Sequence, residues 1–180
     1  MKNSIMTEKL ARRGLRVHQE YEVDVFHQIT VGRVMDTQPA VVPTDVRIGD
    51  LAERIAQGEP ALVRHQAILL ANQKGELAGI STRGDLLRGL ERDPSGNLSV
   101  LAAGTDQPRV AYADETLNDA FSRMLRQGRG RLPVVDRKNP GKIVGYLGRT
   151  AVLEARLRRL HEDHVREPGW LKTALRTSPN

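Results

Sequence analysis

The chain contains no cysteine, which excludes disulfide frameworks, cysteine-ligated zinc sites and cysteine nucleophiles. Only 3% of its 180 residues are aromatic, although 39% are hydrophobic, so a core must be built from Leu, Ile, Val and Ala. No run approaches the roughly 20 apolar residues that a membrane-spanning helix needs, and the first residues do not resemble a signal peptide. For the chain as given, we expect a soluble protein of one compact domain or two small ones.

Recognisable catalytic motifs are also missing. The sequence has no phosphate-binding Gly-x-x-x-x-Gly-Lys-Ser/Thr loop, no Gly-x-Ser-x-Gly elbow and no His-Glu-x-x-His, and Gly128-Arg129-Gly130 is not a dinucleotide fingerprint. His161 and His164 lie one helical turn apart beside two acids, but a third metal ligand is not apparent, so we interpret them as a solvated helix face. We expect no enzyme, no metal site and no resident cofactor.

The charge is unbalanced toward basic residues. The formal net charge is +6 and the sequence pI is about 10.0, which suits nucleic acid, anionic lipid or anionic small molecules as partners. The excess belongs mostly to the first 33 residues and to residues 156–176, where acids are interspersed. We therefore expect no dedicated nucleic-acid surface, and binding of nucleic acid by the two ends rests on charge alone.

The most informative stretch is Gly79-Ile80-Ser81-Thr82-Arg83-Gly84-Asp85, which joins an apolar strand to a helix. Thr82 occupies the position of an N-cap and Asp85 follows three residues later, so their side-chain oxygens can satisfy free N–H groups of the first turn. The same helix start suits a phosphate, and its carboxylate can accept hydrogen bonds from ribose hydroxyls. A bare helix cap and a ligand site are both open readings.

The elements around this junction occur twice along the chain. The first unit predicts an extended segment at 37–42, a helix from Ile48 to about Gly58, strands at 61–63, 67–71 and 77–81, and a helix from Thr82 to about Arg92. The second predicts a helix through Leu117 and Met124 with a cap from Thr116 and Asp119, strands at 132–136 and 143–147, and a final helix to about 160. Its junction carries Gly148 and Ala151 where the first has Thr82 and Asp85.

This duplicated order, with its Val-x-x-Val-Met, Leu132-Pro133-Val134-Val135-Asp136 and Gly-Ile-x-Thr-x-x-Asp-Leu-Leu segments, resembles a tandem pair of cystathionine-β-synthase (CBS) repeats, a Bateman module. The resemblance implies an α/β fold in which each repeat is a small sheet with flanking helices and the two repeats pack as a pseudo-symmetric pair. We place the repeats at residues 34–92 and 98–160, with a linker at 93–97, a leader at 1–33 and a tail at 161–180. Such pairs dimerise, so we expect a homodimer.

The resemblance also implies where an adenine nucleotide (ATP, ADP or AMP) would bind. By position, the predicted site comprises Thr82, Asp85, Val110, Gly130, Arg131 and Pro133. Arg129 and Arg131 are either phosphate contacts or part of a solvated turn. The mirror pocket would combine His65 and Gln66 with Gly148 and Ala151, and since it lacks the carboxylate we expect one site at most. His65 is expected to be a surface loop histidine unless it stacks on a base.

The leader resembles a more specific family context. Its segments Ser4 to Gly14, Tyr21-Glu22-x-Asp24-Val25 and Val31-Gly32-x-Val34-Met35 are similar to the cytosolic connection between the last membrane helix and the CBS pair of ClC-type chloride channels and transporters. This resemblance implies a regulatory fragment at the cytoplasmic face of the cell membrane, whose membrane-embedded ClC partner domain is missing from the chain. The alternative is a stand-alone CBS-pair nucleotide sensor, or the regulatory domain of an enzyme.

Overall fold

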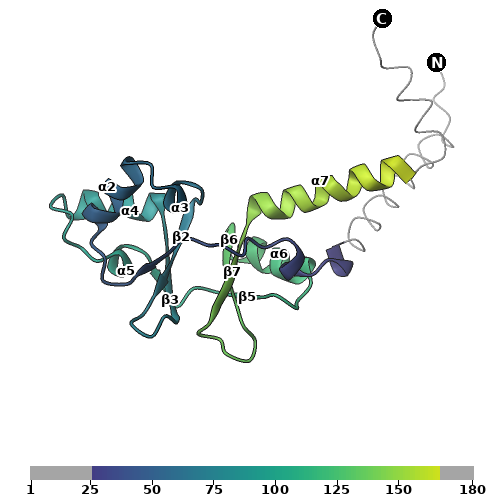
Figure 1. Cartoon of the computed structure of the whole chain (residues 1–180), viewed down its shortest axis with the longest axis horizontal. Helices are drawn as coiled ribbons and strands as arrows, with labels where there is room; N and C mark the ends of the chain where they lie inside the picture. The colour runs from purple at the N-terminus through teal and green to yellow at the C-terminus, as the bar shows by residue number, and fades with distance from the viewer. Residues whose placement is uncertain (1–25, 167–180) are drawn as a thin grey trace, which may run out of the picture.

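The computed structural model describes residues 26–166, so the predicted helix near residues 7–13, most of the leader and the end of the tail lie outside the described residues. The described chain contains two separate sheets (Figure 1). The first has the order β1 (Val41–Pro43), β2 (Ala67–Ala71), β3 (Leu77–Thr82) and β4 (Thr105–Asp106). The second has the order β5 (Ala111–Tyr112), β6 (Arg131–Val135) and β7 (Ile143–Gly148).

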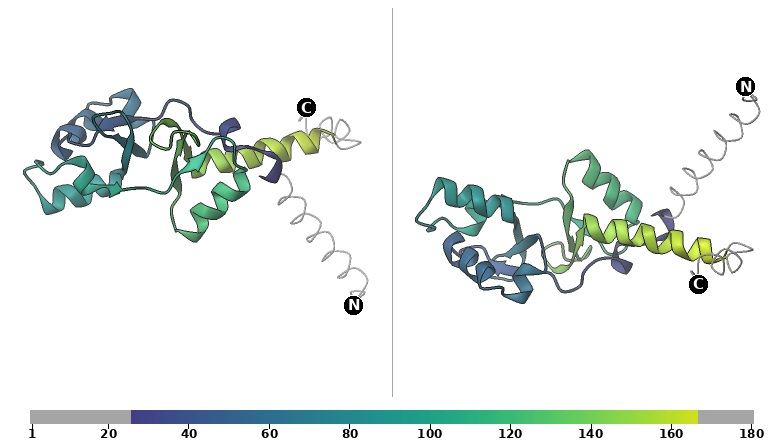
Figure 2. Two further views of the ribbon diagram at one scale, coloured as in Figure 1. Left: turned by 90° about the horizontal axis from the view of Figure 1, so that it is seen from below. Right: turned by 90° about the horizontal axis from the view of Figure 1, so that it is seen from above.

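Helices flank both sheets. They are η1 (Val31–Arg33), α2 (Ile48–Ala56), α3 (Pro60–Val63), α4 (Arg83–Arg92), α5 (Val100–Ala103), α6 (Leu117–Arg126) and α7 (Arg149–Arg166). The two sheets lie side by side along the long axis of the molecule, and α7 runs outward beyond the second sheet (Figures 1 and 2). The predicted α/β pair of small sheets with flanking helices is therefore confirmed. None of the helices in residues 26–166 has both the length and the apolar character needed to cross a bilayer.

The two sheets repeat one strand arrangement in matching register. In each, the first strand is parallel to the second, and the second is antiparallel to the third. Thr82 pairs with Ala67 in the first sheet, as Gly148 pairs with Arg131 in the second. This register makes Gly148 the structural equivalent of Thr82.

The helices α2, α4 and α6 follow the predicted apolar spacing. Ile48 and Leu51 on α2, and Leu117 on α6, are completely buried. Thr116 caps α6 as predicted, because its Oγ1 accepts a hydrogen bond from the Asp119 N–H at 3.1 Å. Periodicity at intervals of three and four residues was sufficient to locate these helices.

The strand predicted at residues 61–63 is wrong. These residues belong to the short helix α3, in which Leu62 is buried while Ala61 and Val63 are exposed. Pro60 occupies the first turn, where its fixed φ suits a helix and its missing N–H leaves no hydrogen bond unmade. A run of three apolar residues was too short to distinguish the two structures.

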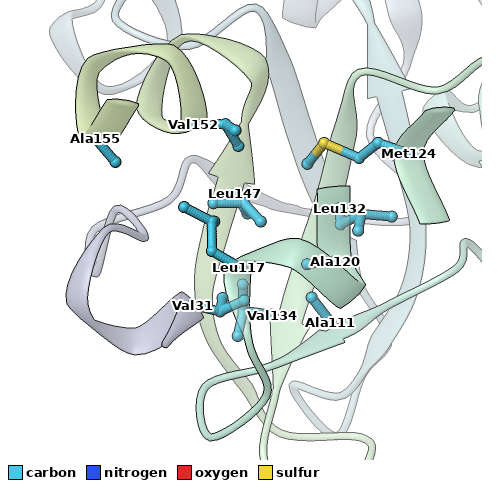
Figure 3. Close-up of a cluster of buried hydrophobic side chains, with 10 residues drawn as sticks. All are labelled: Val31, Ala111, Leu117, Ala120, Met124, Leu132, Val134, Leu147, Val152 and Ala155. Atoms are coloured by element: carbon cyan, nitrogen blue, oxygen red, sulfur yellow. The ribbon is translucent and has the colours of Figure 1, made fainter. Parts of the chain in front are cut away.

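Each half of the fold contains a short segment that precedes the other repeat along the chain. The segment that includes η1 packs on the second sheet: the Val31 and Gly32 N–H groups donate to Glu115 and Ala113 at 3.0 and 2.8 Å, and Asp36 bridges to Tyr146. Figure 3 shows Val31 among the side chains of this core, near Leu117 and Val134. In return, α5 and β4 pack on the first sheet. The segment before each repeat thus packs on the sheet of the other repeat, although the two repeats still follow one another along the chain.

A small third core joins the halves. Ala67, Leu69 and Ile80 from the first sheet form one buried cluster with Tyr146 from the second. The turns beneath are also linked, because the Leu77 N–H donates to the Gly141 carbonyl at 2.8 Å. The sheets consequently meet along β2, β3, β6 and β7, and the strand ends on either side of this contact form the walls of two cavities.

Candidate functional site

The larger cavity opens between the repeats and has a volume of about 570 Å³. One wall comes from Asp36 and the loop before β2, and the other from the start of β6 and the junction between β7 and α7. Its lining residues are Asp36, Arg64, His65, Gln66, Gly128, Gly130, Arg131, Tyr146, Gly148, Arg149, Thr150, Ala151, Leu153 and Glu154. The four mirror-pocket residues named from the sequence, His65, Gln66, Gly148 and Ala151, are therefore brought together.

His65 lines this cavity from the first repeat. Its side chain is only 7% exposed, so the interpretation of His65 as a surface loop histidine is wrong. Nε2 lies 3.1 Å from the Gln38 carbonyl oxygen and 3.7 Å from Asp36 Oδ2, and the ring contacts Tyr146 edge-on with centroids 5.6 Å apart. The buried ring is thus held by neighbours from two segments, residues 36–38 and β7.

Tyr146 presents a buried phenol to the same cavity. Burial raises the pKa of the Tyr146 phenol, because the charged phenolate would lose its hydration. The Arg131 guanidinium opposes this shift in pKa, and the Asp36 carboxylate adds to it. Tyr146 therefore stays neutral over the physiological range and can offer a hydroxyl to a ligand.

Three guanidinium groups and two carboxylates complete the lining. Arg131 Nη2 donates to Gln66 Oε1 at 2.7 Å, which connects the second repeat to the first, and Arg64 Nη2 lies 3.4 Å from Asp36 Oδ2. The Arg149 guanidinium lies against Gly130, where an added Cβ would come within 3.2 Å of it. Arg149 and Glu154 are both on the first turns of α7. The cavity thus offers groups for an anion and groups for hydroxyls.

Thr82 and Asp85 do not line either of the cavities described here. They form a complete capping box on α4: Thr82 Oγ1 accepts from the Asp85 N–H at 3.2 Å, and Asp85 Oδ2 accepts from the Thr82 N–H at 2.8 Å. The same Oδ2 accepts from the Thr82 hydroxyl at 2.7 Å, and Arg88 pairs with the other carboxylate oxygen. The capping function is shown by this geometry, while a ligand role for the pair stays a prediction.

The other predicted site residues are divided between two environments. Gly130 and Arg131 line the larger cavity, together with the mirror-pocket residues and not with Thr82 and Asp85 as the resemblance implied. Val110 and Pro133 line neither cavity: the Val110 carbonyl accepts a hydrogen bond from Arg123 Nη1 at 2.6 Å, and Pro133 is buried in β6 opposite Tyr146. Because Pro133 and Tyr146 are directly opposite in the ladder, their side chains lie on the same face of the second sheet.

Sequence reasoning missed several residues of the larger cavity, including Asp36, Tyr146, Arg149 and Glu154. Arg149 had a signal, since it follows Gly148 as Arg83 follows Thr82. Asp36 had none, because its position depends on the exchange of the N-terminal segment onto the second sheet. No sequence pattern within one repeat predicts that the N-terminal segment packs on the second sheet.

A smaller cavity of about 170 Å³ lies at the equivalent place on the other side. It is lined by Ile80, Thr105, Gln107, Pro108, Arg109, Gln127, Arg129, Arg131 and Leu132. Thr105 pairs with Ile80 as Asp36 pairs with Tyr146, so the two cavities are related by the pseudo-symmetry of the repeats. Arg131 lines both cavities.

Metal ligation has no visible basis in the described part of the chain. Residues 26–166 contain no group of three or more His, Asp or Glu side chains arranged to hold a metal ion. His161 and His164 fall on α7, but their side chains are outside what the structure describes.

Comparisons with known proteins agree with this architecture. The crystal structure of CBSX2 from Arabidopsis thaliana in complex with AMP matches with 27% identity and a TM-score of 0.59, covering 73% of this chain and 98% of that one. A putative acetoin utilization protein from Vibrio cholerae matches with 18% identity and a TM-score of 0.63, covering 78% and 98%. At this lower identity the likeness shows the fold alone.

The sequence itself matches a known domain family twice. A comparison with curated protein sequences finds no match. The sequence profile of the CBS domain, in contrast, matches residues 31–92 and again residues 103–158. These two matches correspond to the two halves seen in the structure. The chain therefore belongs to the CBS domain family, as a tandem CBS pair.

Proposed function

We propose that this CBS pair is a regulatory module that binds an adenine nucleotide in the larger cavity. The observation that carries the proposal is the cavity itself: its volume of about 570 Å³ lies within the roughly 300–1,000 Å³ typical of small-molecule sites, and it is lined by both repeats. The AMP complex of the 27% identical CBSX2 supports the ligand class.

The polar groups of the cavity suit the parts of a nucleotide. Guanidinium groups bind phosphate through paired N–H donors, and Arg64, Arg131 and Arg149 supply three of them. Carboxylates accept hydrogen bonds from ribose hydroxyls, and Asp36 and Glu154 supply two. Ala151 stands where the first junction has Asp85, and Asp36 and Glu154 can supply the carboxylate that it lacks. We therefore place nucleotide binding at the second junction, where the sequence predicted no binding.

The proposed mechanism is a population shift between relative arrangements of the repeats. A ligand changes such an equilibrium only by binding one arrangement more tightly than the other. Gln66 and Arg131 come from different repeats and hydrogen-bond across the cavity at 2.7 Å. A nucleotide that inserts between these side chains would favour one spacing of the repeats, and this is the regulatory output that we propose in place of catalysis.

Thermal melts test the proposal. We expect millimolar AMP, ADP or ATP to raise the unfolding midpoint, because a ligand at about 100 times its dissociation constant stabilises the folded state by about 2.7 kcal/mol. Arg149→Gln should reduce this shift, whereas Arg92→Gln on the exposed end of α4 is the matched control that keeps it. Asp85→Ala should lower the midpoint of the free protein but leave the nucleotide shift in place. Loss of the shift in Asp85→Ala with retention in Arg149→Gln would move the site to the first junction.

We also propose that the module is a homodimer. Leu87 on α4 and Leu125 on α6 are each 63% exposed, and contact with a second copy of the chain would remove their apolar surface from water. Multi-angle light scattering should give about twice the mass of one chain. A concentration-independent monomer mass, unchanged in Leu87→Lys, would contradict the dimer.

The finer proposal concerns the larger protein that the module regulates. The leader's resemblance to the connection in ClC-type channels and transporters supports a chloride channel or chloride/proton exchanger, with the module at the cytoplasmic face of the membrane. A stand-alone sensor or an enzyme's regulatory domain fits the described residues equally well. The upstream reading frame separates them: apolar spans ending just before Ser4 support the ClC context, and a verified start at Met1 contradicts it.

A further inference from the structure

We propose that the end of the molecule formed by the second repeat docks on an anionic lipid surface, with α7 lying in the membrane interface and Leu157 in contact with the lipid. An uncovered apolar side chain on α7, the positive charge around it and the position of both chain ends point to this partner. Such docking requires no nucleotide in either cavity.

The first turns of α7 have two apolar faces, of which the described fold covers one. Val152 and Ala155, three residues apart, are buried in the core of the second repeat. Leu153 and Leu157, four residues apart, share a different face and are 48% and 63% exposed. Leu153 also lines the larger cavity, whereas Leu157 lines neither cavity. Leu157 therefore presents to solvent a large apolar side chain that the described residues leave mostly uncovered.

Both ends of the described chain lie at the same end of the molecule. Phe26, at its start, contacts Phe121 with ring centroids 6.2 Å apart and packs on the same core as Val152. At its other end, α7 has 18 residues, about 27 Å at 1.5 Å per residue, and runs outward beyond the second sheet (Figures 1 and 2). The basic leader and the basic tail are therefore both attached at the end formed by the second repeat.

The charge around Leu157 selects an anionic partner. Residues 149–160 contain four arginines and one acid, Glu154. The side chains of Arg149 and Arg158 are exposed, and the ion pairs described within residues 26–166 involve neither of them. Exposed leucine together with arginine is typical of helices that lie in a membrane interface, because the leucine enters the lipid while the arginine reaches the headgroups.

Charge also disfavours the other partners that could cover Leu157. A second copy of α7 would bring two arginine-rich helices together, and like charges repel. The first 17 residues of the leader contain five basic residues and one acid, so α7 repels them as well. Nucleic acid would pair with the arginines through its phosphates but would leave the leucine without an apolar partner. A lipid surface satisfies both the charge and the apolar side chain.

The sequence after α7 has a composition that suits the same partner. Trp170 is the only tryptophan of the chain, and the residues that follow it include Leu171, Lys172, Leu175 and Arg176. Tryptophan is enriched where membranes meet water, since its ring is apolar and its N–H is polar. The tail can therefore add to a contact that begins on α7.

Flotation of the full chain with lipid vesicles tests the docking. We expect binding to vesicles of equal parts phosphatidylcholine and phosphatidylglycerol, and much weaker binding to phosphatidylcholine alone. Leu157→Gln should weaken the binding about tenfold, because the exposed part of a leucine would no longer leave water. Val63→Gln, which replaces an exposed apolar side chain on α3 of the first repeat, is the matched control and should bind like the parent chain.

Arg158→Gln tests the charge separately from the apolar contact. It should weaken binding to the anionic vesicles about fivefold, the usual effect of one basic residue near such a surface, whereas Arg92→Gln on α4 should have no effect. Absence of binding to the anionic vesicles, or equal binding by Leu157→Gln and the parent chain, would overturn the docking of α7. A lower mass of Leu157→Gln in light scattering would overturn it too, because a second copy would then cover this leucine. Tighter binding to duplex DNA than to the vesicles, unchanged in Leu157→Gln, would favour nucleic acid instead.

Discussion

At the scale of single residues, the position of Gly145 shows what the exchange of segments requires. Gly145 lies in β7, and a Cβ added there would come within 2.8 Å of the Asp36 carbonyl oxygen and 2.7 Å of Met35 Sδ. The carbonyl belongs to the backbone that bridges to Tyr146, so it cannot move aside without breaking that bridge. The close approach that places Asp36 in the larger cavity thus depends on the absence of a side chain.

Gly145→Ala should therefore lower the free energy of unfolding by about 1–3 kcal/mol, as overpacking of a tight contact does. Gly84→Ala is a suitable control, because the atom closest to its added Cβ is the flexible Arg88 guanidinium at 3.3 Å and alanine favours a helix. Chemical denaturation measures both. Equal stability of Gly145→Ala and the parent chain would contradict the tight packing of residues 35–36 on β7.

Tyr146 gives a pH dependence at the same scale. Because burial raises its pKa above the unfolded value of about 10, the folded state holds the phenolic proton more tightly. The stability from this group is complete below about pH 10 and is lost as pH rises through the folded pKa. Tyrosinate absorbance should show a titration step above the ordinary pKa of a tyrosine, and Tyr146→Phe should remove that step. An unchanged titration curve in the variant would be inconsistent with a buried phenol.

At the scale of elements, the capping box of α4 contributes to the stability of the helix, whereas the proposed nucleotide site lies at the other junction. Both of its reciprocal hydrogen bonds are made within the chain, and Arg88 takes the remaining carboxylate oxygen. The same residue pattern that suggests a nucleotide site is therefore fully explained by helix formation. The second junction, without such a box, opens into the larger cavity.

Thr82→Ala should lower the free energy of unfolding by about 1 kcal/mol, the usual value of an N-cap, without reducing the thermal shift caused by AMP. Thr116→Ala, which removes the cap of α6, is the matched control and should show a similar loss. Denaturation and melts with AMP measure the two quantities. A nucleotide shift abolished in Thr82→Ala but kept in Thr116→Ala would favour the first junction as a binding site.

The sequence predicted the elements whose signal is local. The apolar spacing around Ile48 and Leu117 located α2 and α6, and the turn before Leu77 located the hairpin of β2 and β3. It failed at residues 61–63, where three apolar residues are compatible with helix and strand alike. It also missed α5, since Val100–Ala103 is too short to show a period.

At the scale of the whole molecule, the fold class followed from the duplication, but the site did not. The resemblance places Gly130 and Arg131 in a pocket with Thr82 and Asp85, whereas the structure shows them in the larger cavity beside the second junction. Asp36 reaches that cavity only through packing between distant segments, which a sequence read locally does not encode. The capacity of each cavity depends likewise on side chains from both halves, so the choice between the two junctions required the structure.

The central claim is that a nucleotide binds in the larger cavity, between the repeats. The most direct measurement is a titration of the isotope-labelled chain with AMP, followed by amide nuclear magnetic resonance. The account predicts the largest shifts at Gln66, Arg131, Gly148 and Thr150, from both sides of that cavity. Shifts concentrated at Thr82, Gly84 and Asp85, or no saturable shifts at all, would contradict it.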